Sequence, residues 1–115
     1  MKLKIKEDEI ELVYSFRSSI YFEQITGHNI DLSNLTQNDL ITLFYCIFIA
    51  SLQKAKKPII DMLTFLDIVD DNGGDKVIIE FSNWFIDVMR AQYEVLNSVE
   101  DDGKQKDNPA KKKTA

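Results

Sequence analysis

The chain has 115 residues, of which 44% are hydrophobic and 10% aromatic, and its net charge at pH 7 is −5. This composition excludes wholesale disorder, and the length allows one domain with a modest core. Residues 1–99 carry 9 basic and 15 acidic side chains, whereas residues 100–115 carry 5 basic and 4 acidic ones. Nucleic-acid binding needs clustered Lys and Arg, so the acidic body argues against a nucleic-acid partner.

The first twelve residues predict a β-hairpin. Apolar and charged residues alternate over residues 2–6 and again over residues 9–12, which would turn Leu3 and Ile5 inward. The polar residues 7–8 between the two segments suit a tight turn. Two strands alone are marginal in water, so the hairpin is expected to pack on helices or on another subunit. The alternation also lacks the continuous apolar region of a signal peptide.

A first helix is predicted over residues 16–26, with Ser15 as its N-cap and Gly27 just after its end. Two apolar faces are expected on this helix, and Phe22 lies outside both of them. One face holds Phe16 and Ile20, and the other holds Tyr21 and Ile25. Phe16 is expected to be a core residue. A helix that is apolar on several sides is expected to have more than one neighbour.

A second helix is predicted over residues 37–53, because Thr36 and Asp39 match the [ST]-x-x-[DE] start signal. Its body is apolar all round and must be surrounded. Two interpretations are open: the helix is enclosed by its own chain, or part of the first two helices is covered only by a partner. Cys46, the single cysteine, is expected to be a buried core thiol.

A third helix is predicted over residues 59–69, with Pro58 at its first position and Asp61 in its first turn. Its expected apolar stripe is Ile59, Met62, Leu63, Leu66 and Val69. A fourth helix is predicted over residues 76–98, capped by Asp75, with Arg90 placed to pair with Asp87 and Glu94.

No large apolar residue follows Val99, so residues 100–115 are expected to form a disordered charged tail. The predicted fold class is therefore mainly α: an N-terminal β-hairpin, a four-helix domain over residues 1–99, and the tail. The longest apolar run, residues 40–52, is shorter than the roughly 20 residues that cross a bilayer, so no membrane partner is expected.

Catalytic and metal-binding motifs are not found in the sequence. His28 is the sole histidine and is expected to be a loop residue. The acidic loop over residues 67–75 fails the EF-hand pattern, because Ile68 or Val69 would take the first ligand position. Gly73 and Gly74 are not followed by the Lys-Ser/Thr of a phosphate loop. We therefore expect no enzyme activity and no cofactor.

Residues 14–27 carry the most informative pattern, with Phe16-Arg17, Phe22-Glu23 and Thr26-Gly27 separated by four and two residues. This pattern resembles the opening of the small tail assembly chaperones of long-tailed, siphovirus-type bacteriophages, which read roughly F-R-x-x-x-x-[FL]-E-x-x-T-G. The resemblance extends loosely to about residue 99.

The resemblance implies a protein that coats the tape measure protein, keeps it soluble and recruits tail tube subunits during tail assembly. It would act in the cytoplasm of an infected or lysogenic bacterial host and would self-associate. The expected partner-binding residues are Arg17, Tyr21, Phe22, Glu23 and Tyr45. Phe22 is the preferred contact, because it lies outside both apolar faces of its helix. The alternative is a generic helical protein-interaction adaptor or an inhibitor of a host protein.

Overall fold

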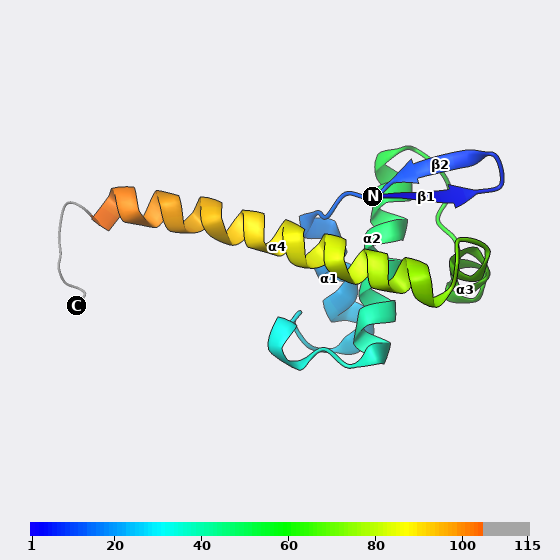
Figure 1. Ribbon diagram of the computed structural model, residues 1–115, viewed down its shortest axis with the longest axis horizontal. Helices are drawn as coiled ribbons and strands as arrows, with labels where there is room; N and C mark the ends of the chain where they lie inside the picture. Colours follow the sequence, from blue (N-terminus) through cyan, green and yellow to red (C-terminus); the bar gives the residue numbers. More distant parts are fainter. Residues whose placement is uncertain (105–115) are drawn as a thin grey trace. The chain divides into compact units, whose positions relative to one another are not determined.

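The computed structural model describes the backbone of residues 1–104 and the side chains of residues 1–94. An N-terminal antiparallel hairpin is followed by four α-helices, so the predicted mainly α fold class is confirmed (Figure 1). The chain divides into two compact units, Met1–Trp84 and Phe85–Ala115, and the division falls within the last helix. The hairpin, three complete helices and the start of the fourth make up the first unit.

The hairpin pairs β1 (Lys2–Ile5) with β2 (Asp8–Glu11) in an antiparallel ladder. Leu3 lies directly opposite Ile10, and both side chains are buried, because residues that oppose each other on paired strands face the same side of the hairpin. Lys6 takes a left-handed backbone conformation in the turn between the strands. β2 contacts the second helix, so the hairpin does pack on a helix, as its marginal stability requires.

Helix α1 spans Phe16–Thr26, as predicted. Ser15 and Ser18 form a reciprocal capping box, in which each side chain is bonded to the other residue's backbone N–H. Gly27 ends the helix with φ at 81°, a left-handed conformation that glycine adopts without a Cβ penalty. Both ends of α1 are therefore fixed by local sequence.

A short 3-10 turn, η1 (Leu32–Asn34), precedes helix α2 (Gln37–Lys54). Thr36 and Asp39 form the capping box at the start of α2, which confirms the start signal in the sequence.

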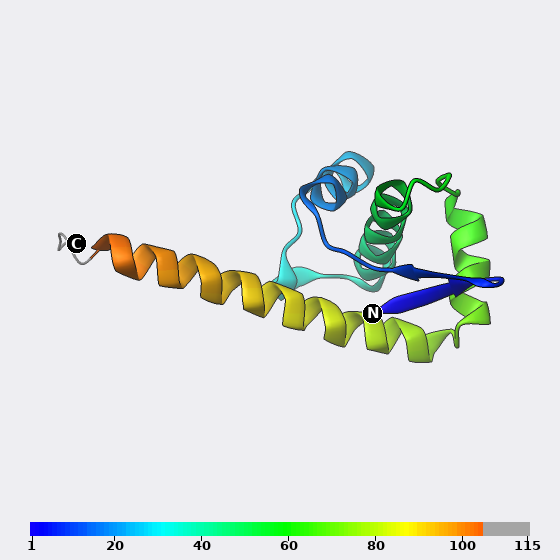
Figure 2. The same cartoon turned by 90° about the horizontal axis from the view of Figure 1, so that it is seen from above.

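Helix α2 is the centre of the first unit. Its residues from Leu43 to Leu52 are buried except Tyr45, so this part of the helix is enclosed by its own chain. The Phe44 ring stacks on Phe81 with centroids 4.2 Å apart and meets Phe65 edge-on at 5.1 Å. Cys46 is buried as predicted. In Figure 2, α1 and α3 lie on opposite sides of α2.

Helix α3 begins later than predicted and spans Met62–Asp71. The expected start at Pro58 is wrong, because Asp61 is the N-cap and its carboxylate accepts a hydrogen bond from the Thr64 N–H at 2.8 Å. An Asp that caps a helix takes an extended backbone and cannot also lie in the first turn.

The predicted apolar stripe of α3 is also wrong for most of its members. Ile59 is 54% exposed, Leu63 75% and Leu66 37%, and only Val69 of the predicted stripe is buried. The buried residues are instead Phe65, Ile68 and Val69, at the i, i+3, i+4 spacing of one helical face. Phe65 decides the orientation of the helix, because its ring enters the aromatic cluster on α2.

Helix α4 spans Asp75–Lys104, so it continues past the predicted end at residue 98, and Asp75 is its first residue instead of its cap. Arg90 pairs with Asp87 at 3.3 Å, as the i, i+3 spacing predicts. Residues 100–104 of the predicted tail are helical, and residues 105–115 lie outside the part of the chain that the structure describes.

Candidate partner-binding surface

Half of the chaperone-like pattern on α1 is structural. Phe22 is 0% exposed, and its ring meets His28 edge-on at 5.5 Å. Thr26 donates a hydrogen bond from its hydroxyl to the Phe22 carbonyl at 2.7 Å and accepts one from the His28 N–H at 3.3 Å. Together with Gly27, these residues end α1 and fix the chain that comes after it. The expectation that Phe22 contacts a partner is therefore wrong, because its side chain is in the core.

The prediction for Phe16 is wrong in the opposite direction. It was expected in the core, but its side chain is 80% exposed at the start of α1. Ser18 and Phe22 are the buried residues of α1, which packs against α2. At about 100° per residue, Phe16 lies about 200° from Ser18 and about 120° from Phe22, so it points away from the core. Sequence reasoning missed this exposure, because it did not expect the small polar residue Ser18 to lie on the buried face.

Arg17 and Tyr21 are brought together by a side chain that sequence reasoning did not single out. Gln53, near the end of α2, accepts hydrogen bonds at its Oε1 from the Tyr21 hydroxyl at 2.7 Å and from Arg17 Nη1 at 3.2 Å. The guanidinium carries five N–H donors, so most of them stay available to a partner. Tyr21 is half-buried and mainly ties α1 to α2.

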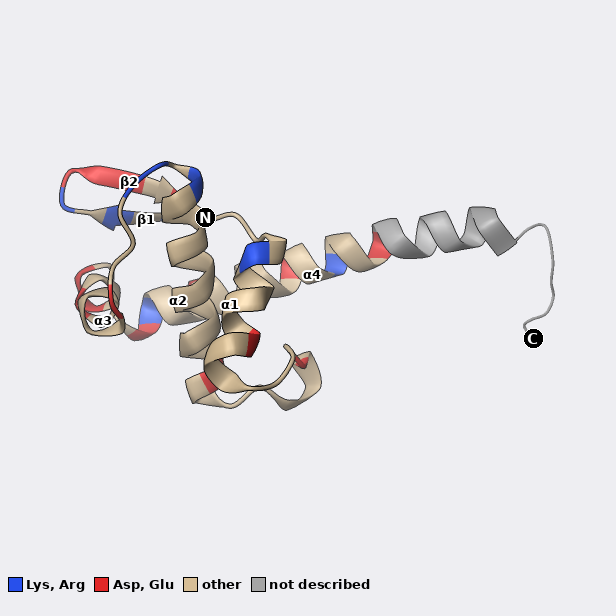
Figure 3. Ribbon diagram, turned by 180° about the vertical axis from the view of Figure 1, so that it is seen from behind, with Lys and Arg blue, Asp and Glu red and all other residues tan. Residues whose placement is uncertain are grey.

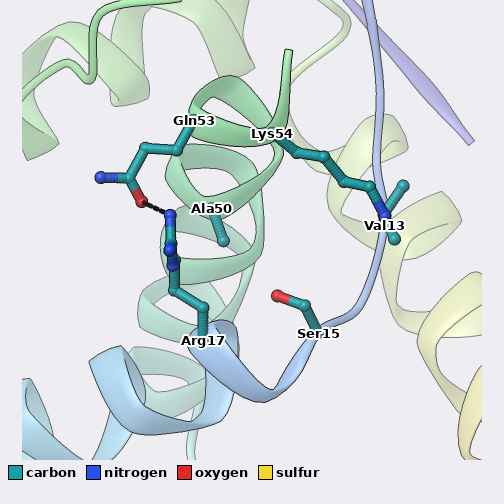
Figure 4. A pocket seen from close by; sticks show the side chains of 6 residues that line it. All are labelled: Val13, Ser15, Arg17, Ala50, Gln53 and Lys54. Carbon is teal, nitrogen blue, oxygen red and sulfur yellow. Dashed lines mark hydrogen bonds between the residues drawn. The ribbon is translucent and has the colours of Figure 1, made fainter. Parts of the chain in front are cut away.

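A hollow of about 370 Å³ opens beside this contact. Figure 4 shows the side chains that line it. Its lining residues come from the start of α1, the segment before it and the end of α2. They are Val13, Ser15, Arg17, Ala50, Gln53 and Lys54. The hollow thus combines small apolar surfaces with two cationic side chains. We call Phe16 together with this hollow the α1–α2 surface.

The two remaining predicted contacts differ in position. Glu23 is exposed on α1. Tyr45 is half-buried on α2, where its hydroxyl donates a hydrogen bond to the Ile60 carbonyl at 2.6 Å and its ring packs on Phe65 at 5.5 Å. Because α1 and α3 flank α2 on opposite sides (Figure 2), Tyr45 is not part of the α1–α2 surface. Its contacts hold the segment before α3 in place.

Reactive groups are few in the part of the chain that the structure describes. No group of three or more His, Cys, Asp or Glu residues there could hold a metal ion. Burial raises the pKa of the Cys46 thiol to about 12, so the thiol stays protonated and inert at neutral pH. None of the described helices is long and apolar enough to cross a bilayer.

Comparisons with protein-family models, with curated proteins and with solved structures found no match to this chain.

Proposed function

We propose that the protein is a tail assembly chaperone of the kind that long-tailed bacteriophages use. It binds the tape measure protein, keeps that client soluble in the cytoplasm of the infected or lysogenic host, recruits tail tube subunits and self-associates. The sequence supports this proposal through the pattern on α1. The structure supports it because half of the residues of that pattern are structural and the other half are exposed. Phe22, Thr26 and Gly27 build the helix, whereas Phe16, Arg17 and Glu23 lie on its surface.

The observation that carries the proposal is the exposure of Phe16. A phenylalanine that is 80% exposed in the free protein gains from burial in a complex, and aromatic and Arg side chains dominate the binding energy of interfaces. Arg17 is the next residue, and its guanidinium borders the hollow. In the proposed complex the Phe16 ring packs on the client, an apolar side chain of the client enters the hollow, and client carboxylates or carbonyls accept hydrogen bonds from Arg17 and Lys54.

The overall charge suits the same role. A chaperone has to stay soluble while it covers an apolar client, and a net charge well away from zero opposes aggregation. The chain has a net charge of −5, and the α1–α2 surface adds cations locally at Arg17 and Lys54. Binding through such a surface needs no cofactor and is reversible.

Co-expression with the tape measure protein tests this proposal. Phe16→Ser should weaken binding of the client at least about tenfold, or about 1.4 kcal/mol of binding free energy, and so lower the soluble fraction of the client. The thermal midpoint of the Phe16→Ser variant should stay within a few degrees of that of the wild type, because the Phe16 side chain is already exposed. Ile25→Ser is the matched control, since Ile25 is a 53% exposed apolar residue on the same helix, about 180° from Phe16.

Each outcome of this experiment has a definite meaning. Equal loss with Phe16→Ser and Ile25→Ser would show that the effect is not specific to the α1–α2 surface. A Phe16→Ser variant that still keeps the client soluble would place the contact elsewhere. If the wild type never solubilises the client, the chaperone proposal fails, and the adaptor or inhibitor alternative is left.

A further inference from the structure

Helix α3 presents a second surface that the proposed client contact does not use. Leu63, Leu66, Asp67 and Asp70 have the i, i+3, i+4, i+7 spacing of one helical stripe, and all four are exposed. Ile59, in the segment just before the helix, is also exposed. We call these five residues the α3 face. The α1–α2 surface lies on the other side of α2 (Figure 2), so the two surfaces are separate.

The apolar part of the α3 face is unusually open. Leu63 is 75% exposed, Ile59 54% and Leu66 37%, although the opposite stripe of the same helix is buried through Phe65, Ile68 and Val69. Single exposed leucines are common on protein surfaces, but apolar side chains that gather on one helical face mark an interaction site.

The charge of this region indicates what kind of partner fits. Residues 58–75 contain five Asp and no Lys or Arg, and Figure 3 shows acidic residues along α3. Among the described residues, no cation lies within 4.0 Å of an α3 carboxylate. Lys4 and Lys6 border a hollow of about 440 Å³ that Asp67 also lines, whereas Leu63, Leu66 and Asp70 do not line it. The α3 face therefore keeps its negative charge unpaired.

The position of the acids within the helix strengthens this conclusion. The C-terminal end of a helix carries partial negative charge and favours cations. Helix α3 has no basic residue in its last turn, and Asp70 and Asp71 are its final two residues. The carboxylates and the helix dipole therefore add to one another, and an incoming cation would be attracted by both.

We propose that the α3 face binds a basic amphipathic helix of a partner protein. The apolar side chains of the partner helix pack on Ile59, Leu63 and Leu66, and its Lys or Arg side chains pair with Asp67 and Asp70. Helices that lay an apolar stripe into a complementary surface are a common mode of recognition, and charged flanks set their orientation. This second site would let the protein hold two partners at once.

A synthetic peptide tests the proposal without knowledge of the natural partner. The probe is a helical peptide of about 18 residues with leucines along one stripe and lysines on the flanks, a length at which an isolated helix begins to be stable. A control peptide keeps the leucines and carries glutamates in place of the lysines. Binding to the full chain is measured by calorimetry at low and at moderate salt. We expect the lysine peptide to bind and the glutamate peptide to bind at least tenfold more weakly.

Two double variants separate the apolar and the charged contributions. Leu63→Ser with Leu66→Ser should weaken binding of the lysine peptide at least tenfold. Asp67→Asn with Asp70→Asn should weaken it several-fold and remove most of its salt dependence, since screening acts on the charge pairs.

Matched controls should leave the affinity within about twofold of the wild type. For the apolar pair the control is Ile25→Ser with Leu32→Ser, which are 53% and 50% exposed. For the charged pair the control is Glu7→Gln with Glu9→Gln, two exposed acids of the hairpin. The proposal is overturned if either α3 double variant binds like its control, or if the glutamate peptide binds as tightly as the lysine peptide.

Discussion

Phe22 and Phe16 show how two phenylalanines on one helix take different roles. Phe22 is fully buried, and the hydroxyl of Thr26 bonds its carbonyl, so side chain and backbone both anchor the end of α1. Phe16 lies less than two turns earlier, and its side chain is mostly in solvent. Mutation of the two residues should therefore separate stability from binding.

Phe22→Ala should destabilise the protein by about 3–5 kcal/mol, because it removes a buried ring and leaves a cavity. Phe16→Ala should change the free energy of unfolding by less than about 0.5 kcal/mol, as is usual for exposed side chains. Urea unfolding of both variants, monitored by circular dichroism, measures the two values. Similar losses of stability in both variants would contradict the orientation of α1.

The ends of the helices show which parts of the fold local sequence determines. The Ser15–Ser18 and Thr36–Asp39 caps and the left-handed Gly27 depend on residues a few positions apart, so the bounds of α1 and the start of α2 could be predicted. The start of α3 could not, because Asp61 suits either a cap or a first turn.

Which face of a helix is buried depends on contacts that sequence spacing alone does not reveal. On α3, two alternative stripes are apolar, and the aromatic cluster of α2 selects the stripe that contains Phe65. On α1, the inward position of Ser18 turns Phe16 outward. For the same reason, the candidate site was predicted only in part. Arg17 and Tyr21 are brought together by Gln53, and this contact was not predicted because Gln53 lies far from both residues in the sequence.

The connection between α1 and α2 should respond to pH through His28. Its Nδ1 lies 2.9 Å from the Asn29 carbonyl oxygen, and its Nε2 lies 3.4 Å from the Asp39 carboxylate. Both neighbours are acceptors, so only the protonated ring donates to both. The backbone hydrogen bond to Asn29, with a smaller contribution from Asp39, raises the pKa of His28 above its usual value.

The raised pKa of His28 predicts a specific direction of change. A group whose pKa is higher in the folded state stabilises the fold fully below its unfolded pKa, about 6.5, and loses that contribution as pH rises through the folded pKa. Because His28 is the sole histidine, its imidazole signals can be titrated by NMR without ambiguity. We expect a pKa above 6.5 in the wild type and a lower one in Asp39→Asn. A pKa at or below 6.5 in the wild type would show that these contacts do not form in solution.

The large apolar residues of the chain end before its C-terminal segment. Among residues 1–94, whose side chains the structure describes, the buried hydrophobic residues extend from Leu3 to Phe85. After Val99 the sequence contains only small, polar and charged residues, with 5 basic and 4 acidic side chains over residues 100–115. A segment without large apolar side chains has little surface to bury, so it contributes little to the hydrophobic free energy of folding.

A chain that ends at Val99 should therefore fold with nearly the stability of the full chain. We expect its thermal midpoint to fall by no more than a few degrees, since about 1 kcal/mol shifts the midpoint of a domain of this size by roughly 4–8 °C. A chain ending at Lys104 is the control, because it keeps the full length of α4 and removes only residues 105–115. If both truncations lower the midpoint by more than about 8 °C, the terminal residues contribute to folding. If only the chain ending at Val99 does, the last helical residues stabilise α4, most simply through the hydrogen bonds that lengthen the helix.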